Sequence, residues 1–328
     1  MKKGSLKRRK LEKDHFLPNA VLEKPEWRSW VDRGLFLLLL AVIVIISHTE
    51  TGWDFLLFLK KGEGFNGIPQ VISQQPLQIY FLDVGKADAM IITTGDHHVL
   101  IDAGTYADET TVEIWLKKLG IEELDAVFAS HPDYDHIGGM GQVLRAFPVD
   151  LLIVPEIPEH LTESDPDYQS MLDAMGEGTQ LKIAAIGEQI QFGEIFFEIL
   201  GPLGMHTDLN NYSLVQKLTF GQRSVLFCGD TEKRGETALL TAEADLVADV
   251  LKVGHHGSET SSGAAFLEAV QGQYAVISAG PDRNNLPKPS VLRRLEEVGM
   301  EIHRTDLEGT VMMSTDGEHI WFAGEKAY

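Results

Sequence analysis

The sequence is poor in cysteine and in basic side chains, and both shortages limit what the protein can be. Its single cysteine, Cys228, excludes a disulfide within the chain, and its position in the apolar run 224–228 predicts a core residue. Lysine and arginine number 28 against 49 aspartates and glutamates, a formal net charge of -21. Because a polyanion gains affinity by releasing counterions to basic side chains, this balance argues against broad electrostatic binding of nucleic acid.

Long apolar runs are also scarce, and the strongest of them covers only residues 34–47. As a helix it would measure about 21 Å, less than the roughly 30 Å of a bilayer's hydrocarbon core. Trp30 and Trp53 bracket it at positions typical of membrane interfaces, and the uncharged stretch continues through Thr49. These features predict a single transmembrane anchor over residues 34–50. The alternative is a cleaved signal peptide, which the long basic segment before the run disfavours.

Charge is distributed unevenly along the chain. Residues 1–33 hold ten basic and five acidic side chains, which leaves 18 basic and 44 acidic ones beyond them, a charge of -26. A basic segment before an apolar span favours the cytoplasmic side of a membrane. The sequence therefore predicts a single-pass protein of the cell membrane. Its expected parts are a basic cytoplasmic tail (1–33), the anchor (34–50), a linker with several Gly and Pro (51–76) and an acidic extracellular body (77–328).

The body alternates between strand-rich and helix-containing stretches. The β-rich runs 77–84, 89–93 and 99–102 predict a meander, and a second set of strands is expected between residues 189 and 227. Each set is followed by alternating helical and extended segments. Two twisted sheets packed face to face with helices outside satisfy this pattern, so the expected fold class is α/β, an αββα sandwich. The acidic segment 156–178 carries no motif and is expected to be irregular.

Four potential metal ligands fall within six residues of one loop. They are His131, Asp133, Asp135 and His136. The run before them, 124–129, is short and apolar enough for a buried strand, and Gly138-Gly139 opens a second apolar run. Imidazole nitrogen and carboxylate oxygen suit zinc, manganese or iron. Alternation along the loop would point three of the ligands one way and His136 the other, so the loop can hold two neighbouring ions.

The spacing His-x-Asp-x-Asp-His-x-Gly-Gly at 131–139 resembles the metal motif of the metallo-β-lactamase superfamily, in the variant with aspartate at the second ligand position. Other stretches similar to the family's motifs are Asp83-Val-Gly-Lys-Ala-Asp88, Gly229-Asp230, His255-His256-Gly-Ser and Thr305-Asp306-x-x-Gly309. The match runs from Leu77 to Phe322 and is strongest with the hydrolase domains of ComEC-type competence proteins. It implies an αββα fold, two divalent ions (zinc or manganese) and hydrolytic activity.

The resemblance also implies roles for particular residues. The implied metal ligands are His131, Asp133, Asp135, His136, Asp230, His255 and His256. Asp230 would bridge the two ions, and one of the paired histidines would close the second site while the other contacts substrate. The resemblance does not choose between them. Residues implied to take part in catalysis are Asp135, His255, His256 and Asn211, and carboxylates implied to orient the ligand imidazoles are Asp83, Asp88 and Asp102.

Three positions depart from the family's pattern. Relatives of the β-lactamase type carry a third histidine for the first metal where this chain has Asn210 to Ser213, so Asn211 or a water would complete that shell. Lys288 stands where relatives have a histidine, and Lys86 and Ala87 replace Gln and Gly. We therefore expect the first metal to be held more weakly than the second.

Two adjacent divalent ions lower the pKa of a shared water and hold an anionic oxygen opposite it, which suits the hydrolysis of phosphodiesters, lactones, thioesters or β-lactams. The resemblance favours a phosphodiesterase or nuclease that acts on DNA or on a phosphodiester-linked wall polymer, in the setting of competence and DNA uptake. The charge of the body stands against nucleic acid. Basic candidates near the motif loops are Lys252, Arg283, Lys288 and Arg304. The alternatives are a hydrolase of lactones or other esters and a non-catalytic, eroded metallohydrolase that serves as an envelope binding module.

Overall fold

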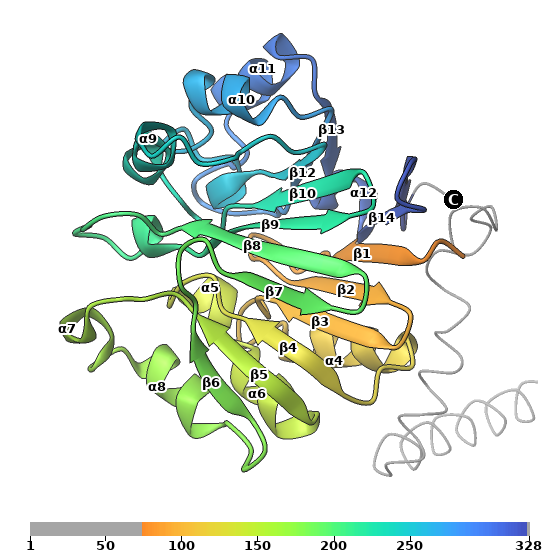
Figure 1. The fold of residues 1–328 in the computed structure, drawn as a ribbon, viewed down its shortest axis with the longest axis vertical. Coiled ribbons are helices and arrows are strands. Elements are labelled where there is room, and N and C mark those ends of the chain that lie inside the picture. Colours follow the sequence, from red (N-terminus) through yellow and green to blue (C-terminus); the bar gives the residue numbers. More distant parts are fainter. Residues whose placement is uncertain (1–73, 327–328) are drawn as a thin grey trace, which may run out of the picture. The chain divides into compact units, whose positions relative to one another are not determined.

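Residues 74–326 are described by a computed structural model, in which two β-sheets pack face to face with helices outside (Figure 1). In spatial order the first sheet contains β15 (Ile320–Gly324), β14 (Val311–Thr315), β1 (Leu77–Phe81), β2 (Met90–Thr94), β3 (His97–Ile101), β4 (Leu124–Phe128), β5 (Val149–Val154) and β6 (Gln180–Ile183). The second contains β13 (Glu301–Arg304), β12 (Tyr274–Ile277), β11 (Val250–Lys252), β10 (Arg223–Phe227), β9 (Val215–Phe220), β8 (Ile195–Gly201) and β7 (Gln189–Phe192).

The helices are divided between the two outer faces. On the side of the first sheet lie α4 (Glu109–Lys118), α5 (Tyr134–Ile137), α6 (Met140–Ala146), α7 (Glu159–Thr162) and α8 (Pro166–Asp173). With the second sheet lie α9 (Lys233–Thr241), α10 (Ala264–Val270), α11 (Pro289–Glu297) and α12 (Thr305–Glu308), and the 3₁₀ turns η1 (Asn210–Tyr212) and η2 (Gly254–Gly257). The expected αββα sandwich is therefore confirmed for this part of the chain.

Alternation along each strand builds three separate apolar layers. In β4, for example, Val127 faces the helices of the first sheet while Ala126 and Phe128 face the second sheet. Between the sheets, the Phe128 and Phe197 rings lie 4.9 Å apart, centroid to centroid. Because side chains of a strand point alternately to opposite faces, a strand buried on both faces needs an almost continuous apolar run.

Strand direction brings the carboxyl ends of several strands to one edge. β3, β4, β5 and β6 are parallel to one another, and so are β10, β11, β12 and β13. β1 runs the same way as β3, since each pairs antiparallel with β2. In open α/β sheets ligands bind outside the carboxyl ends of the strands. All the motif loops of this sequence follow such ends.

One expectation about local structure was wrong. The segment 156–178 is not irregular throughout, because it contains α7 and α8. Helix α8 is well specified: the Asp165 side chain accepts hydrogen bonds from the backbone N–H groups of Asp167 and Tyr168, and Pro166 occupies the first helical position.

The predicted tail (1–33), anchor (34–50) and most of the linker (51–76) lie outside the described residues. Among residues 74–326, no helix combines the length and the apolar character that a membrane crossing needs.

Candidate metal centre

The motif loop begins where β4 ends. Ser130 and His131 continue the strand into a loop, Asp133 stands just before α5, and Asp135 and His136 lie within this single-turn helix. The loop backbone packs closely on the neighbouring strand end. A Cβ at Gly139 would come within 2.3 Å of the carbonyl oxygen of Ala103, so only glycine permits this approach.

Four buried ligand groups converge from three strand ends. His136 Nε2 lies 3.2 Å from Asp230 Oδ1, and His256 Nε2 lies 3.7 Å from the same oxygen. His256 Nε2 is also 3.5 Å from Asp135 Oδ2. Ligand atoms around one tetrahedral zinc, each about 2.0–2.1 Å from the metal, are about 3.3 Å apart. The spacing of these atoms therefore fits a single divalent ion.

A second group of ligand atoms shares His136 and Asp230 with the first and adds His131. Ligand atoms of His131, His136 and Asp230 all lie within 4.8 Å of one another. His131 Nε2 is 3.6 Å from Asp133 Oδ2, whose side chain is the more exposed of the two. His255 lies near the other carboxylate oxygen of Asp230, with its Nε2 3.6 Å from Asp230 Oδ2. Asp230 thus stands between two sets of imidazoles.

The inward-facing atoms of this cluster lack hydrogen bonds. Nε2 of His131, His136 and His256 and Oδ1 of Asp230 are buried with no hydrogen-bond partner. An unpaired buried polar atom is costly, and most are satisfied in folded proteins. Four such atoms facing one another, all nitrogen or carboxylate oxygen, fit a site for zinc or manganese.

The other ring nitrogen of each histidine is held from outside. His136 Nδ1 lies 2.8 Å from Asp102 Oδ2, and Ser130 in turn donates from its backbone N–H (2.8 Å) and its hydroxyl (2.7 Å) to Asp102. His256 Nδ1 donates to the carbonyl oxygen of Ser278 at 3.2 Å. His255 Nδ1 lies 3.3 Å from Glu232 Oε1. Partners of this kind orient the imidazoles of metal sites.

The paired histidines owe their directions to an unusual backbone. His255 and His256 both have φ of 51°, in the left-handed region that side-chain-bearing residues seldom adopt. Such strain persists only where the surrounding structure enforces it, and it is concentrated at functional sites. His256 is fully buried with its Nε2 toward Asp135, whereas the side chain of His255 is 20% exposed. The geometry favours His256 as the partner of Asp135 and His136.

Mutual charge stabilises the ionised forms in the cluster. Burial opposes the charge on Asp230, but His136 and His256 outweigh it and hold the pKa of that carboxyl well below its ordinary value. Burial likewise opposes protonation of His136, but Asp230 and Asp102 hold its pKa well above the usual value. Burial lowers the pKa of His255, which favours the neutral imidazole that can donate an electron pair.

Asp88 belongs to a buried ion pair beneath the cluster. Lys252 Nζ donates to Asp88 Oδ2 at 2.8 Å and to the carbonyl oxygen of Val253 at 3.1 Å, and both charged side chains are 1% exposed. The other carboxylate oxygen of Asp88 lies 3.7 Å from His256 Nδ1. Lys252, a candidate for substrate contact on sequence grounds, is therefore enclosed and unable to reach a ligand in solvent.

Two residues proposed from the sequence lie apart from the ligand atoms. The side-chain oxygen of Asn211 accepts hydrogen bonds from the backbone N–H groups of Glu232 and Gly235. The side-chain NH2 group of Asn211 donates to Asp208. Its side chain therefore joins η1 to the start of α9 and does not complete a metal shell. Asp83 pairs with Lys326 at 3.1 Å and faces a different cavity.

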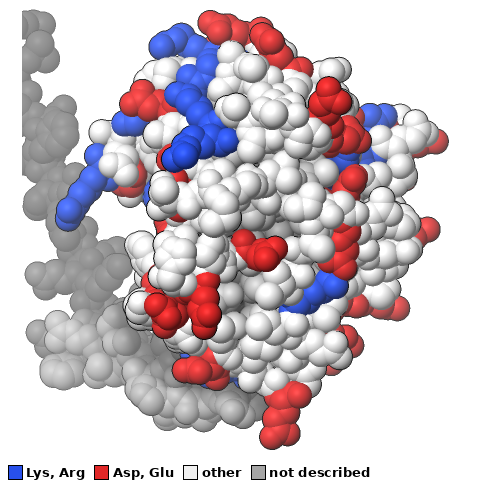
Figure 2. All heavy atoms as spheres, turned by 60° about the vertical axis from the view of Figure 1, so that its left-hand side comes forward, with Lys and Arg blue, Asp and Glu red and all other residues white. Residues whose placement is uncertain are grey.

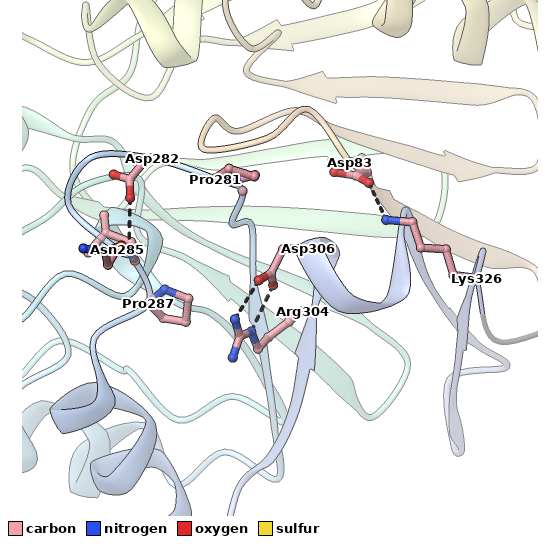
Figure 3. Close-up of a pocket in the computed structure, with 10 residues that line it drawn as sticks. Asp83, Pro281, Asp282, Asn285, Pro287, Arg304, Asp306 and Lys326 are labelled. Carbon is pink, nitrogen blue, oxygen red and sulfur yellow. Dashed lines mark hydrogen bonds and ion pairs between the residues drawn. The ribbon is translucent and has the colours of Figure 1, made fainter.

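This cavity, close to 640 Å³ in volume, opens beside the loop between β1 and β2 (Figure 3). Its lining consists of Asp83, Gly280, Pro281, Asp282, Asn285, Leu286, Pro287, Arg304, Asp306 and Lys326. The Arg304 guanidinium forms two hydrogen bonds with Asp306, so it is already paired. The cavity is thus polar, with three carboxylates against two cations.

Sequence reasoning missed several residues that contact the cluster. Ser130 links Asp102 to His136, and Glu232 lies against His255. Lys86 forms an ion pair with Asp135 Oδ2. The sequence shows only that Lys86 stands where the family has Gln, because its partner lies 49 residues away in the sequence.

Surface charge follows the acidic composition. In Figure 2, basic side chains gather mainly in the upper left of the face shown, whereas acidic side chains are spread over much of the remainder. A protein that binds long duplexes carries a continuous band of basic side chains as its electrostatic footprint. No such band crosses the face shown in Figure 2.

Comparison with known proteins agrees with this geometry. Residues 82–280 match the family described as "Metallo-beta-lactamase superfamily". ComE operon protein 3 of Bacillus subtilis (strain 168) is 32% identical over 254 residues, which are 71% of this chain and 32% of that protein. Competence protein ComA of Neisseria gonorrhoeae is 29% identical over 74% of this chain and 33% of that protein. The chain spans about a third of the length of these relatives.

A solved structure shows the same fold. CmlA, a diiron beta-hydroxylase from Streptomyces venezuelae, has a TM-score of 0.50 to this chain at 16% identity. The superposition covers 71% of this chain and 53% of CmlA. At this identity the likeness concerns the fold alone.

Proposed function

The chain belongs to the metallo-beta-lactamase superfamily, and from that premise we propose that it is a metal-dependent phosphodiesterase or nuclease that uses two divalent ions, zinc or manganese. The observation that carries the proposal is the set of four buried atoms that face one another without hydrogen bonds, on His131, His136, His256 and Asp230. A binding module would have no need to maintain such an arrangement, because these atoms cost stability unless a cation satisfies them.

Each ion has its own set of proposed ligands. Asp135, His136 and His256 would hold the second ion together with Asp230 Oδ1. His131 and Asp133 would hold the first, with Asp230 shared between the ions. His255, whose Nε2 is 3.6 Å from Asp230 Oδ2, would take the place left by the missing third histidine. The first site is the more exposed and is expected to bind more weakly.

Two bound divalent ions would lower the pKa of a water and stabilise negative charge on a substrate oxygen. The protein's own groups prepare for that chemistry. Asp102 and the carbonyl of Ser278 fix the ring orientations of His136 and His256. Asp230 supplies one carboxylate to both sets of ligands, which offsets repulsion between two cations held close together.

One observation supports a phosphodiester as substrate, and a second limits the form that such a substrate can take. The relatives at 32% and 29% identity are named as a ComE operon protein and a competence protein, and a role beside DNA uptake would present a phosphodiester chain. The acidic surface favours a single strand, a chain end or a wall polymer over a long duplex, because few phosphates could be neutralised at once.

We also propose that the body is held outside the cell membrane by the apolar run 34–50 behind a basic tail. Protease added to intact cells should then remove the body and spare residues 1–33. Protection of the body in intact cells would contradict this topology.

The function can be tested on the purified protein after its metals are removed with a chelator. Zinc or manganese is then titrated in during assays with bis-nitrophenyl phosphate, DNA, a lactone and a cephalosporin. We expect phosphodiester cleavage to be low without metal and to rise with occupancy of the first site. His131→Ala should abolish this rise and leave roughly one ion per chain by elemental analysis, because the second site keeps its ligands.

The matched control is His319→Ala, which removes a histidine whose side chain is 67% exposed and which should change neither metal content nor activity. Turnover of the lactone or cephalosporin but not of either phosphodiester would replace the proposed substrate class. Absence of turnover on every substrate at full metal occupancy would favour the binding module.

A further inference from the structure

We propose that Lys86 is an anion-binding residue beside the metal centre, which contacts a negatively charged oxygen of the substrate and selects anionic esters over neutral ones. The inference rests on the proposed hydrolytic function and specifies how the site would recognise its substrate. Nothing in the ligand set itself distinguishes an anionic ester from a neutral one.

The backbone beneath Lys86 is held rigidly by contact with another loop. A Cβ at Gly280 would lie 2.4 Å from Gly85 Cα and 2.8 Å from the backbone nitrogen of Lys86, so the two loops touch through their main chains. Gly85 has φ of +70°, which turns the chain between β1 and the buried Asp88. Residues built on such tightly packed backbone keep a defined direction, as a recognition residue must.

The Lys86 side chain reaches the ligand cluster from a partly exposed position. Its ammonium pairs with Asp135 Oδ2, the oxygen that also faces His256 Nε2 at 3.5 Å. The side chain of Lys86 is 24% exposed, against 8% for Asp135 and 0% for His256. The positive charge therefore stands one ligand away from the proposed second ion, on the side from which a substrate can approach.

Charge balance shows why this position matters. Two divalent ions together with Lys252 would neutralise the five aspartates of the centre, which are Asp88, Asp102, Asp133, Asp135 and Asp230. When Glu232, which lies 3.3 Å from His255, is counted as well, Lys86 is the group that brings the whole centre from negative to neutral. An anionic substrate oxygen would be attracted by this one charge at short range, where screening by salt is weak.

Other cations around the site are paired with carboxylates that lie outside the proposed ligand set. Lys252 is enclosed with Asp88, Arg304 is paired with Asp306, and Lys326 is paired with Asp83. Gly280, which contacts the Lys86 loop, also lines the cavity of Figure 3. The loop thus adjoins a space of close to 640 Å³ that can receive the remainder of a substrate.

The test compares Lys86→Met and Lys86→Arg with the parent at saturating manganese. For Lys86→Met we expect kcat/KM on bis-nitrophenyl phosphate to fall about 10- to 100-fold, the usual effect of losing a hydrogen bond to a charged group. Activity on a neutral nitrophenyl ester should change by less than about 3-fold, and Lys86→Arg should recover most of the phosphodiester activity. Metal content should remain that of the parent.

A matched control is Lys117→Met, which removes a cation paired with Glu113 in α4, outside both the ligand cluster and the cavity, and should leave kcat/KM for the phosphodiester unchanged. Equal losses on charged and neutral esters, or loss of bound metal in Lys86→Met, would show that Lys86 only supports the ligands and would overturn the proposal. Unchanged kcat/KM on the phosphodiester would overturn it as well.

The proposal remains testable if the parent cleaves no phosphodiester. Calorimetric titration of the metal-loaded protein with inorganic phosphate should then give an affinity that falls about 10-fold or more in Lys86→Met and is kept in Lys117→Met. Equal phosphate affinity in the parent and Lys86→Met would reject the anion site independently of the reaction. Failure of the proposed function would instead appear as absence of turnover with phosphate binding intact.

Discussion

Removal of the Lys252 charge should destabilise the body strongly while leaving its surface unchanged. The ammonium and the Asp88 carboxylate form a 2.8 Å pair in which both side chains are 1% exposed. Lys252→Met keeps most of the side-chain volume but leaves Asp88 as a buried carboxylate whose nearest titratable neighbours are imidazoles at 3.7 and 4.0 Å. The pKa of Asp88, which Lys252 holds low against the effect of burial, would then rise.

The magnitude follows from the burial of the pair. Removing one partner of a buried ion pair costs about 3–5 kcal/mol, because the remaining charge is neither solvated nor paired. For a domain of about 250 residues each kcal/mol lowers Tm by about 2–4 °C, so Lys252→Met should lower it by roughly 6–20 °C. The exposed pair of Lys117 with Glu113 offers a matched comparison, and Lys117→Met should cost less than about 1 kcal/mol.

Thermal unfolding of the purified, metal-free protein, followed by circular dichroism, measures both variants. A double variant, Lys252→Met with Asp88→Asn, should recover much of the loss because it removes the unpaired charge. If the Tm of Lys252→Met lies within a degree or two of the Tm of Lys117→Met, the buried ion pair does not stabilise the body as expected. Failure of the double variant to recover stability would show that Lys252 acts through packing and not through charge.

Three further outcomes are expected. Asp230→Asn should lower both activity and the metal content, from roughly two ions per chain to one or fewer, because the repulsion between the ions is no longer offset. Full metal content by elemental analysis would reject the bridging role. Gly280→Ala should reduce phosphodiester activity at unchanged metal content, because its Cβ would displace Gly85 and Lys86, and parental kinetics would show that the loop contact is unimportant. Cys228, whose pKa burial raises, should react with a thiol reagent only after unfolding in urea, and rapid modification of the native protein would contradict its place in the core.

Much of the fold could be predicted because it depends on local patterns. Apolar alternation specifies which residues of β4 face each layer, and the same pattern recurs in β1, β3 and β10. The ligand spacing at 131–136 was informative for a related reason. A short loop at the end of a buried strand has few ways to place four polar side chains, so the cluster could be recognised before its surroundings were known.

Local patterns were misleading where a side chain takes its partner from a distant segment. Asp83 was expected to orient an imidazole, but the end of the chain supplies Lys326 to its carboxylate. Asn211 was expected near the first ion, but the first turn of α9 offers unpaired backbone N–H groups that its amide satisfies. The sequence alone could not show that Asp83 and Asn211 have these partners, because a polar group binds whichever partner the fold brings nearest.

By itself the sequence determined the layered α/β architecture, and it predicted the loop 131–136 and the paired histidines as candidate site residues. Only the tertiary structure decided how those histidines divide their roles, since the left-handed backbone at 255 and 256 sends one ring into the buried cluster and the other to its exposed flank. It also decided the place of Lys86, whose meeting with Asp135 requires the packing of two loops 49 residues apart. Directions of side chains depend on backbone angles and on contacts between distant segments, which residue order does not specify.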